Sequence, residues 1–217
     1  MKNKQVYIFL TDTGTLFTRM IKLYTKSTLN HASIAFDEEL NEMYSFGRKN
    51  VRNPFIGGFV REDIHTELFK EAKCAIYSCT VTEFEYYQLK RNIKKIELSE
   101  RDYKYNLIGL LGVVLNIEIE RKNAFFCSQF VATLLSNNGI SLVDKPLSLV
   151  TPQDLSEAKQ LKLIYEGDLD SYPAVKLREG NSTPHSYIDN TVNYLITKKS
   201  RTKATFLSAY HKVRAFM

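Results

Sequence analysis

Cys127 stands at a point in the sequence that suits a nucleophilic thiol. The polar segment 120–123 ends just before it, and an apolar pattern at helical spacing follows until residues 137–139 end it. A thiol in the first turn of a helix feels the positive end of the helix dipole and unpaired backbone N–H groups, which favour its thiolate form. The same N–H groups can stabilise the oxyanion that forms when a thiolate attacks a carbonyl. Cys127 is therefore the candidate nucleophile.

A thiolate nucleophile needs a base, and His31 is the best placed of the four histidines. It opens the alternating segment 31–36, which is typical of a strand. The other histidines lie in polar or C-terminal segments: His65, His185 and His211. A histidine on a strand that faces the N-terminus of a cysteine-bearing helix is the arrangement of a thiol hydrolase. The alternative, from the residues alone, is a buried structural thiol and a histidine at a strand end.

The elements that must position these two residues change in type along the chain. Strands are predicted at 5–11, 31–36, 42–47, 73–81 and 161–166. Helices are predicted at 16–26, at 82–98, at 103–117, from Cys127 onwards, and from Thr151 onwards, where a proline takes the first helical position. The segment 103–117 is apolar nearly all round, which predicts a buried helix. We therefore expect an α+β domain over 1–172 and a helical C-terminal extension over 173–217.

The net charge of +6 lies in the C-terminal extension. Residues 176–217 hold eight Lys or Arg against two Asp or Glu, whereas residues 1–175 are balanced at 22 of each sign. The domain itself thus needs no anionic partner, and no nucleic-acid motif occurs in it, which argues against nucleic acid as a partner. The basic cluster 198–203 and the apolar stripe 206–216 could together lie on an anionic membrane surface.

Cysteine usage and apolar runs indicate the compartment. Three cysteines without regular spacing argue against a disulfide framework, and no CxxC or His/Cys cluster indicates zinc, so no metal and no cofactor are expected. The apolar run 6–10 is too short for a signal peptide, and the longest one, 107–117, is far below a membrane-spanning length. We therefore expect a cytoplasmic protein.

Three segments carry a resemblance to a known family. They are residues 27–36 (STLNHASIAF), 125–134 (FFCSQFVATL) and 151–155 (TPQDL), and their order and spacing match over about residues 5–165. In this respect the chain resembles the circularly permuted papain-like enzymes, the YiiX/YebB-like branch of the NlpC/P60 superfamily, relatives of the lecithin:retinol acyltransferase group. That family places its histidine before its cysteine in sequence. The resemblance implies a permuted papain-like fold, with a small antiparallel sheet or half-barrel and packed helices.

The resemblance also implies roles for individual residues. Cys127 would be the nucleophile and His31 the base that takes its proton and later gives it to the leaving group. The family's third polar residue, on the strand after the histidine strand, corresponds to Ser45. Relatives usually carry a stronger acceptor there, and Glu42 lies on the opposite face of the strand by alternation. Three outcomes remain open: modest activity, completion of the site by Arg48 or a partner, or loss of the chemistry.

Three further residues are candidates for substrate binding. Asp12 closes the first strand and could line the cleft, although capping of the next helix explains it equally well. Arg48 and Arg52 lie in the segment 48–58, which is rich in cations, proline and glycine and predicts a loop. They could hold an anionic group of a substrate, or they could be solvated surface charges.

Two classes of function follow. The first is a cysteine hydrolase of the amidase or peptidase type that forms an acyl-thioester at Cys127, with a lipid acyl hydrolase or acyltransferase as a variant at a membrane surface. The second is a catalytically degenerate binding module, indicated by Ser45, in which the basic C-terminal extension binds a protein or nucleic acid. A reactive thiol at Cys127 would separate the two classes.

Overall fold

The computed structural model describes residues 2–12, 29–49, 57–69 and 71–175. Its contacts divide the chain into two units, 1–172 and 173–217. Three predictions lie outside the described residues: the helix at 16–26, Arg52, and the helical character of the C-terminal extension.

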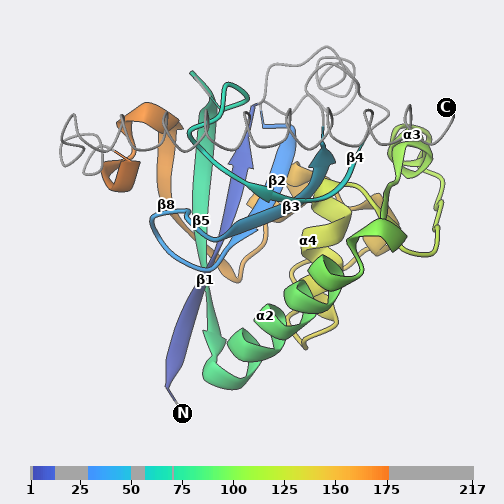
Figure 1. Cartoon of the computed structure of the whole chain (residues 1–217), viewed down its shortest axis with the longest axis horizontal. Helices are drawn as coiled ribbons and strands as arrows, with labels where there is room; N and C mark the ends of the chain where they lie inside the picture. Colours follow the sequence, from blue (N-terminus) through green and yellow to red (C-terminus); the bar gives the residue numbers. More distant parts are fainter. Residues whose placement is uncertain (1, 13–28, 50–56, 70, 176–217) are drawn as a thin grey trace, which may run out of the picture. The chain divides into compact units, whose positions relative to one another are not determined.

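A six-stranded antiparallel sheet forms the framework of residues 1–172 (Figure 1). Its order is β4-β3-β2-β1-β5-β8. The strands are β1 (Asn3–Thr11), β2 (His31–Ala35), β3 (Met43–Arg48), β4 (Gly57–Glu62), β5 (Lys73–Thr82) and β8 (Leu161–Asp168). A separate parallel pair joins β6 (Lys104–Tyr105) and β7 (Ala124–Phe125). Because β1, β2 and β3 are neighbours in the sheet, the histidine strand lies near its middle.

The helices begin where local signals predict them. α2 (Glu83–Leu98) starts with a capping box in which Thr82 and Glu85 bind each other's backbone N–H. α5 (Pro152–Ser156) starts with a capping box between Thr151 and Asp154. The other helices are α3 (Leu107–Leu115) and α4 (Cys127–Ser136), with 3-10 turns η1 (Glu100–Asp102), η2 (Leu147–Leu149) and η3 (Leu169–Ser171). Among the described residues, no helix combines the length and apolar character needed to cross a membrane.

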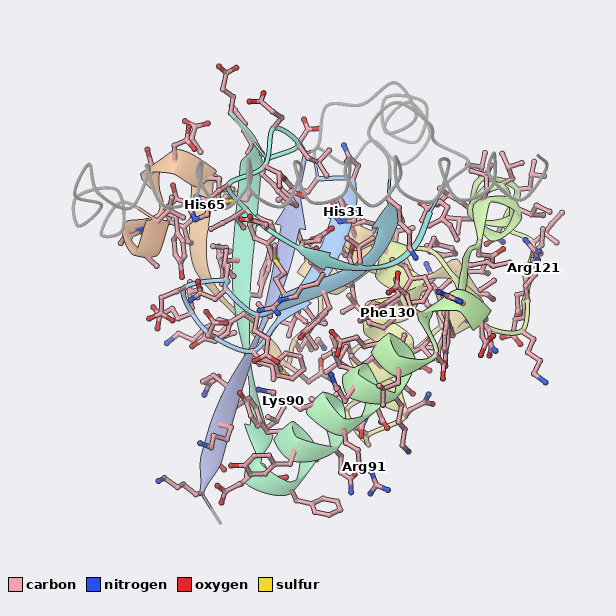
Figure 2. The ribbon with its side chains drawn as sticks, in the orientation of Figure 1. His31, His65, Lys90, Arg91, Arg121 and Phe130 are labelled. Atoms are coloured by element: carbon pink, nitrogen blue, oxygen red, sulfur yellow. The ribbon has the colours of Figure 1, made fainter. Side chains whose placement is uncertain are left out.

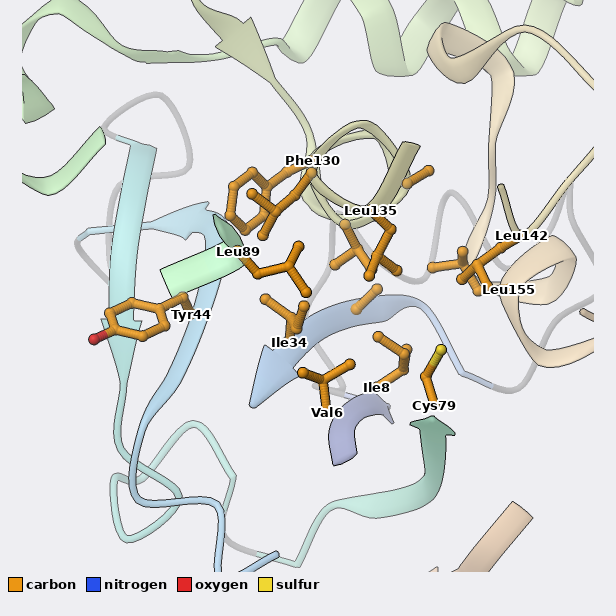
Figure 3. Close-up of a cluster of buried hydrophobic side chains, with 14 of the residues drawn as sticks. Val6, Ile8, Ile34, Tyr44, Cys79, Leu89, Phe130, Leu135, Leu142 and Leu155 are labelled. Carbon is orange, nitrogen blue, oxygen red and sulfur yellow. The ribbon is translucent and has the colours of Figure 1, made fainter. Parts of the chain in front are cut away.

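The hydrophobic core lies between one face of the sheet and the helices α2 and α4 (Figures 1 and 3). Val6 and Ile8 from β1 and Ile34 from β2 meet Leu89 of α2 and Phe130 of α4. All of these side chains are 2% exposed or less, so burial of their apolar area strongly favours this arrangement. The packing of α4 on β2 and β3 is what brings the cysteine helix to the histidine strand.

The α+β class with an antiparallel sheet is confirmed, and two local predictions are wrong. The segment 48–58 was expected to be a loop, but the strand β4 begins at Gly57, inside it, and pairs with β3 along its whole length. The segment 103–117 was expected to be a buried helix, but α3 covers only Leu107–Leu115. Ile108, Leu111 and Leu115 of α3 are 52%, 52% and 65% exposed. Apolar composition thus does not decide which helix face is covered.

Candidate active site

Cys127 is the first residue of α4, at the end where backbone N–H groups lack helical acceptors. Phe126 caps the helix without a side-chain hydrogen bond, and the first backbone hydrogen bond of the helix runs from the N–H of Phe130 to the carbonyl of Phe126 at 2.9 Å. The Ser128 hydroxyl donates to the Val150 carbonyl at 2.7 Å, which fixes the first turn. The Cys127 sulfur accepts hydrogen bonds from the backbone N–H groups of Ala32 and Ser128. A negative charge on this sulfur therefore meets donors already in place.

His31 opens β2 and reaches the thiol from the sheet. It pairs with Thr11 of the neighbouring strand β1, and its side chain is 11% exposed. The imidazole and the Cys127 thiol share a hydrogen bond. Figure 2 shows that His31 belongs to the sheet, whereas His65 comes from the segment between β4 and β5. Of the two histidines in the described part of the chain, only His31 is joined to the cysteine.

Glu62, the last residue of β4, completes a chain of three interacting side chains. Its Oε1 lies 2.7 Å from Nε2 of His31, and its side chain is only 4% exposed. The imidazole therefore lies between a thiol and a carboxylate, both of which are buried. This is the arrangement of nucleophile, base and orienting carboxylate that thiol hydrolases use.

Two serines hold the Glu62 carboxylate in place. Ser33 donates to Oε2 at 2.5 Å, and Ser45 donates to Oε1 at 2.6 Å. Alternation along β2 puts Ser33 on the same face as His31, and the β3–β4 register, which pairs Met43 with Glu62, puts Ser45 on the same face as Glu62. Both carboxylate oxygens are thus bound by donors on neighbouring strands, which fixes the direction in which Glu62 presents its charge.

Gly47 leaves room for the close approach of these side chains. A Cβ added to Gly47 would lie 3.3 Å from the Ser45 hydroxyl and 3.6 Å from Cε1 of His31. The first distance is tighter than ordinary van der Waals contact, so a side chain here would press on the hydrogen-bonded cluster. Gly47 therefore leaves the space into which the imidazole and the Ser45 hydroxyl fit.

The electrostatics favour an ion pair between Cys127 and His31. Burial lowers the pKa of His31, but the charge of Glu62 and the hydrogen bonds to Cys127 and Glu62 outweigh it and raise that pKa to about 10. Burial raises the pKa of the Cys127 thiol, but the hydrogen bond and positive charge of His31, with the two backbone N–H groups, bring that pKa below its ordinary value. Burial also opposes ionisation of Glu62, yet His31 and the two serines lower its pKa. The imidazolium thus lies between two negative groups, the thiolate and the carboxylate, and each ion pair favours the charged forms of its two members.

The other two cysteines differ sharply from Cys127. Burial, with a smaller effect from Asp168, raises the pKa of Cys74 to about 12. Burial, with a smaller effect from Glu85, also raises the pKa of Cys79. Each is therefore a neutral thiol near pH 7, and only Cys127 has the environment of a reactive cysteine.

The structure brings together some, but not all, of the residues that the sequence analysis assigned to the catalytic site. Cys127 and His31 meet as expected, whereas the role expected for Ser45 is wrong: it binds Glu62, and Glu62 is the group that binds the imidazole. Glu62 was missed because its strand follows a proline and begins with two glycines, which are loop signals. No periodic signal in the sequence marks it, because residues 59–62 read apolar, apolar, charged, charged. Glu42 instead forms an ion pair with Lys90 at 2.8 Å.

The candidate substrate-binding residues have different outcomes. Asp12 follows Thr11, which pairs with His31, and it accepts a hydrogen bond from the Asn30 amide at 2.9 Å. Its role in substrate binding stays a prediction. Arg48 ends β3, with its side chain outside the described part, and Arg52 lies outside it altogether.

Within the described ranges, no group of three or more His, Cys, Asp or Glu side chains is arranged to hold a metal ion.

Removing either serine should weaken the site without abolishing it. In Ser45→Ala or Ser33→Ala, Glu62 loses one donor, so its charge is less well held and the pKa of the Cys127 thiol rises. We expect alkylation of Cys127 by iodoacetamide at pH 6.5 to slow by roughly three- to tenfold, since one such hydrogen bond contributes on the order of 1 kcal/mol. Ser78→Ala is the matched control, because Ser78 lies on β5 and bonds only weakly to Lys162. An unchanged rate in both variants would show that the serines do not support the carboxylate.

Comparison of the chain with models of known protein families finds no match, and comparison with curated proteins finds none either. The chemistry assigned to Cys127, His31 and Glu62 therefore depends on their own geometry.

Proposed function

We propose that this protein is a cysteine hydrolase that cleaves an amide bond through an acyl-thioester at Cys127. The observation that carries the proposal is the buried chain of hydrogen bonds from Cys127 through His31 to Glu62. It supports a thiolate at neutral pH and a protonated imidazole beside it, which are the two groups that the first step needs. The order of His31 before Cys127 and the packing of α4 on the sheet also support a permuted papain-like fold.

The first half of the reaction forms the thioester. The Cys127 sulfur attacks the carbonyl carbon, a C–S bond forms, and the carbonyl π electrons move onto oxygen. The N–H groups at the start of α4 are the donors best placed to stabilise this oxyanion. When the tetrahedral intermediate collapses, the C–N bond breaks and the proton on His31 passes to the leaving nitrogen.

The second half returns the enzyme to its starting state. Neutral His31 takes a proton from a water molecule, whose oxygen attacks the thioester carbonyl. The C–S bond breaks, the acid product leaves, and the thiolate again lies beside protonated His31. Throughout both halves Glu62 keeps the imidazole in one orientation and stabilises its positive charge, without reacting itself.

The site geometry weakens the case for a degenerate binding module. That hypothesis depended on Ser45 as the only orienting group, and Glu62 supplies the carboxylate that it assumed to be absent. Burying a carboxylate costs free energy, even when all its hydrogen bonds are formed, unless a positive charge lies beside it. The basic segment on which the binding module would depend lies outside the described residues.

One observation favours an acyl-lipid substrate as a second candidate. Ile108, Leu111 and Leu115 follow one another at helical spacing on α3 and are each at least half exposed. An apolar helix face of this kind is typical of proteins that meet lipid or an apolar partner. The nucleophile and the thioester would be the same, and only the acyl donor would differ.

Trapping the thioester tests the proposal directly. After a short incubation of the full chain with p-nitrophenyl acetate, we expect mass spectrometry to find one acetyl group, on Cys127, that later disappears by hydrolysis. Faster acylation by p-nitrophenyl dodecanoate would favour the acyl-lipid candidate. Cys127→Ala should give no adduct, and Cys74→Ala, the control, should behave like the native chain. Equal labelling of all three cysteines, or an adduct that never hydrolyses, would contradict a hydrolase.

A further inference from the structure

A cavity of about 390 Å³ lies apart from the catalytic residues, between α2, α4 and the strand β7. Its volume is in the range of small-molecule sites. Neither Cys127, His31 nor Glu62 lines it. The cavity and the catalytic cluster nevertheless share α4, because Phe130 and Thr133 of this helix form part of the cavity wall.

Aromatic rings give the cavity an apolar wall. Tyr103 and Phe125 line it and stack on each other, with ring centroids 6.4 Å apart and planes inclined by 24°. Phe130, labelled in Figure 2, continues the wall, and Phe46 packs behind both Phe125 and Phe130 at 5.3 and 4.9 Å. Because these rings pack on one another, they form an aromatic wall against which the ring of a ligand can pack, edge to face or offset.

The polar groups of the cavity are carboxamides, hydroxyls and one ammonium. Three carboxamides line it, from Asn92, Asn123 and Asn137, and they can donate as well as accept hydrogen bonds. Lys95 is the cation, and no Asp or Glu is among the described residues of the wall. The cavity therefore combines donors and one positive charge with no negative charge.

The Lys95 ammonium is not neutralised by the carboxylates that follow it on the chain. Glu97 forms an ion pair with Lys94 at 2.6 Å, and Glu100 pairs with Lys49. In the described part of the chain, no carboxylate lies within 4.0 Å of the Lys95 ammonium. Its charge is thus available to an anion that enters from solvent.

From this combination we infer that the cavity binds a small carboxylate with an apolar, preferably aromatic, body. The ring would lie against Tyr103 and Phe125, and the carboxylate would meet Lys95 and the asparagine amides. The site is separate from the proposed hydrolase site, and its occupancy does not need a reactive Cys127.

Paired probes of the same shape test this inference. The probes are phenylacetate and its neutral counterpart phenylacetamide, titrated into full-length Cys127→Ala, and the readout is the NMR signals of the Asn92, Asn123 and Asn137 side-chain amides. Because the Cys127→Ala chain has no nucleophile, the result is independent of whether the protein is a hydrolase. We expect saturable shifts with phenylacetate at roughly millimolar affinity and at least about fivefold weaker binding of phenylacetamide.

Two neighbouring lysines provide the matched variants. Lys95→Gln should reduce phenylacetate binding about fivefold, to the level of phenylacetamide, because the cation that distinguishes the two probes is gone. Lys94→Gln, one residue away on α2 and outside the cavity wall, should bind phenylacetate like the parent chain. The inference is overturned if the asparagine signals do not saturate with phenylacetate, if both probes bind equally, or if the two lysine variants lose the same affinity.

Discussion

In Glu62→Gln, alkylation of Cys127 by iodoacetamide at pH 6.5 is expected to slow by about 10- to 100-fold. Glutamine keeps the shape and can still accept a hydrogen bond from His31, but it removes the negative charge that outweighs the effect of burial on the imidazole. The pKa of His31 then falls and that of the thiol rises, so the neutral pair replaces the ion pair. The measurement is the alkylation rate of Cys127 against pH, followed by peptide mapping.

The shape of the pH profile distinguishes this explanation from general damage to the site. The native chain should react at a nearly constant rate around neutral pH, because the thiolate is already formed there. The variant should show a rate that rises with pH around the ordinary thiol pKa of about 8.5 or above. Glu42→Gln is the matched control, since Glu42 pairs with Lys90 away from the site. A native-like plateau in Glu62→Gln would show that the carboxylate does not set the thiol pKa.

The same variant has a stability signature whose sign follows from the two pKa shifts. The pKa of Glu62 is lowered in the folded state, so its contribution is present above the unfolded pKa of about 4.3 and lost as pH falls through the folded value. The pKa of His31 is raised, so its contribution is present below about 6.5 and lost as pH rises through about 10. In urea unfolding, the stability difference between native chain and Glu62→Gln should therefore be largest near pH 5 to 6 and smaller near pH 10.

Much of the framework could be predicted from the sequence because its signals are local. The strand predicted at 31–36 is observed at His31–Ala35, and the helix predicted at 82–98 is observed at Glu83–Leu98. Alternating apolar residues specify the first, and a capping box followed by amphipathic spacing specifies the second. The pair Cys127 and His31 was found for the same reason, since each stands at a recognisable element boundary.

Glu62 could not be found in this way because its position depends on pairing between strands. It lies 31 residues after His31, and only the order β4-β3-β2 and the register between β3 and β4 bring its carboxylate to the imidazole. The strand is short and starts with two glycines, so it owes its form to the pairing with β3 rather than to its own pattern. Ser45 was assigned the orienting role because the resemblance places that residue on the strand after the histidine strand, where Ser45 is the best match.

In His31→Ala, alkylation of Cys127 at pH 6.5 is expected to slow by about 100-fold. Without the imidazolium, burial raises the pKa of the thiol, and the N–H groups of Ala32 and Ser128 oppose this only in part. About 1% of the thiol would be ionised at this pH if its pKa were near 8.5. His65→Ala is the matched control, because His65 is exposed and belongs to the segment between β4 and β5.

The His31 variant also separates the two roles of the imidazole. Raising the pH to about 9.5 should restore much of the alkylation rate in His31→Ala, because the thiol then ionises without help. Cleavage of an amide should not recover, since no group remains to protonate the leaving nitrogen, a contribution of about 10² to 10⁴ in rate. If alkylation at pH 6.5 were unchanged, and Cys127 reacted no faster than Cys74 and Cys79 in the native chain, Cys127 would be a structural thiol. The hydrogen-bonded cluster around Glu62 would then serve the stability of the sheet.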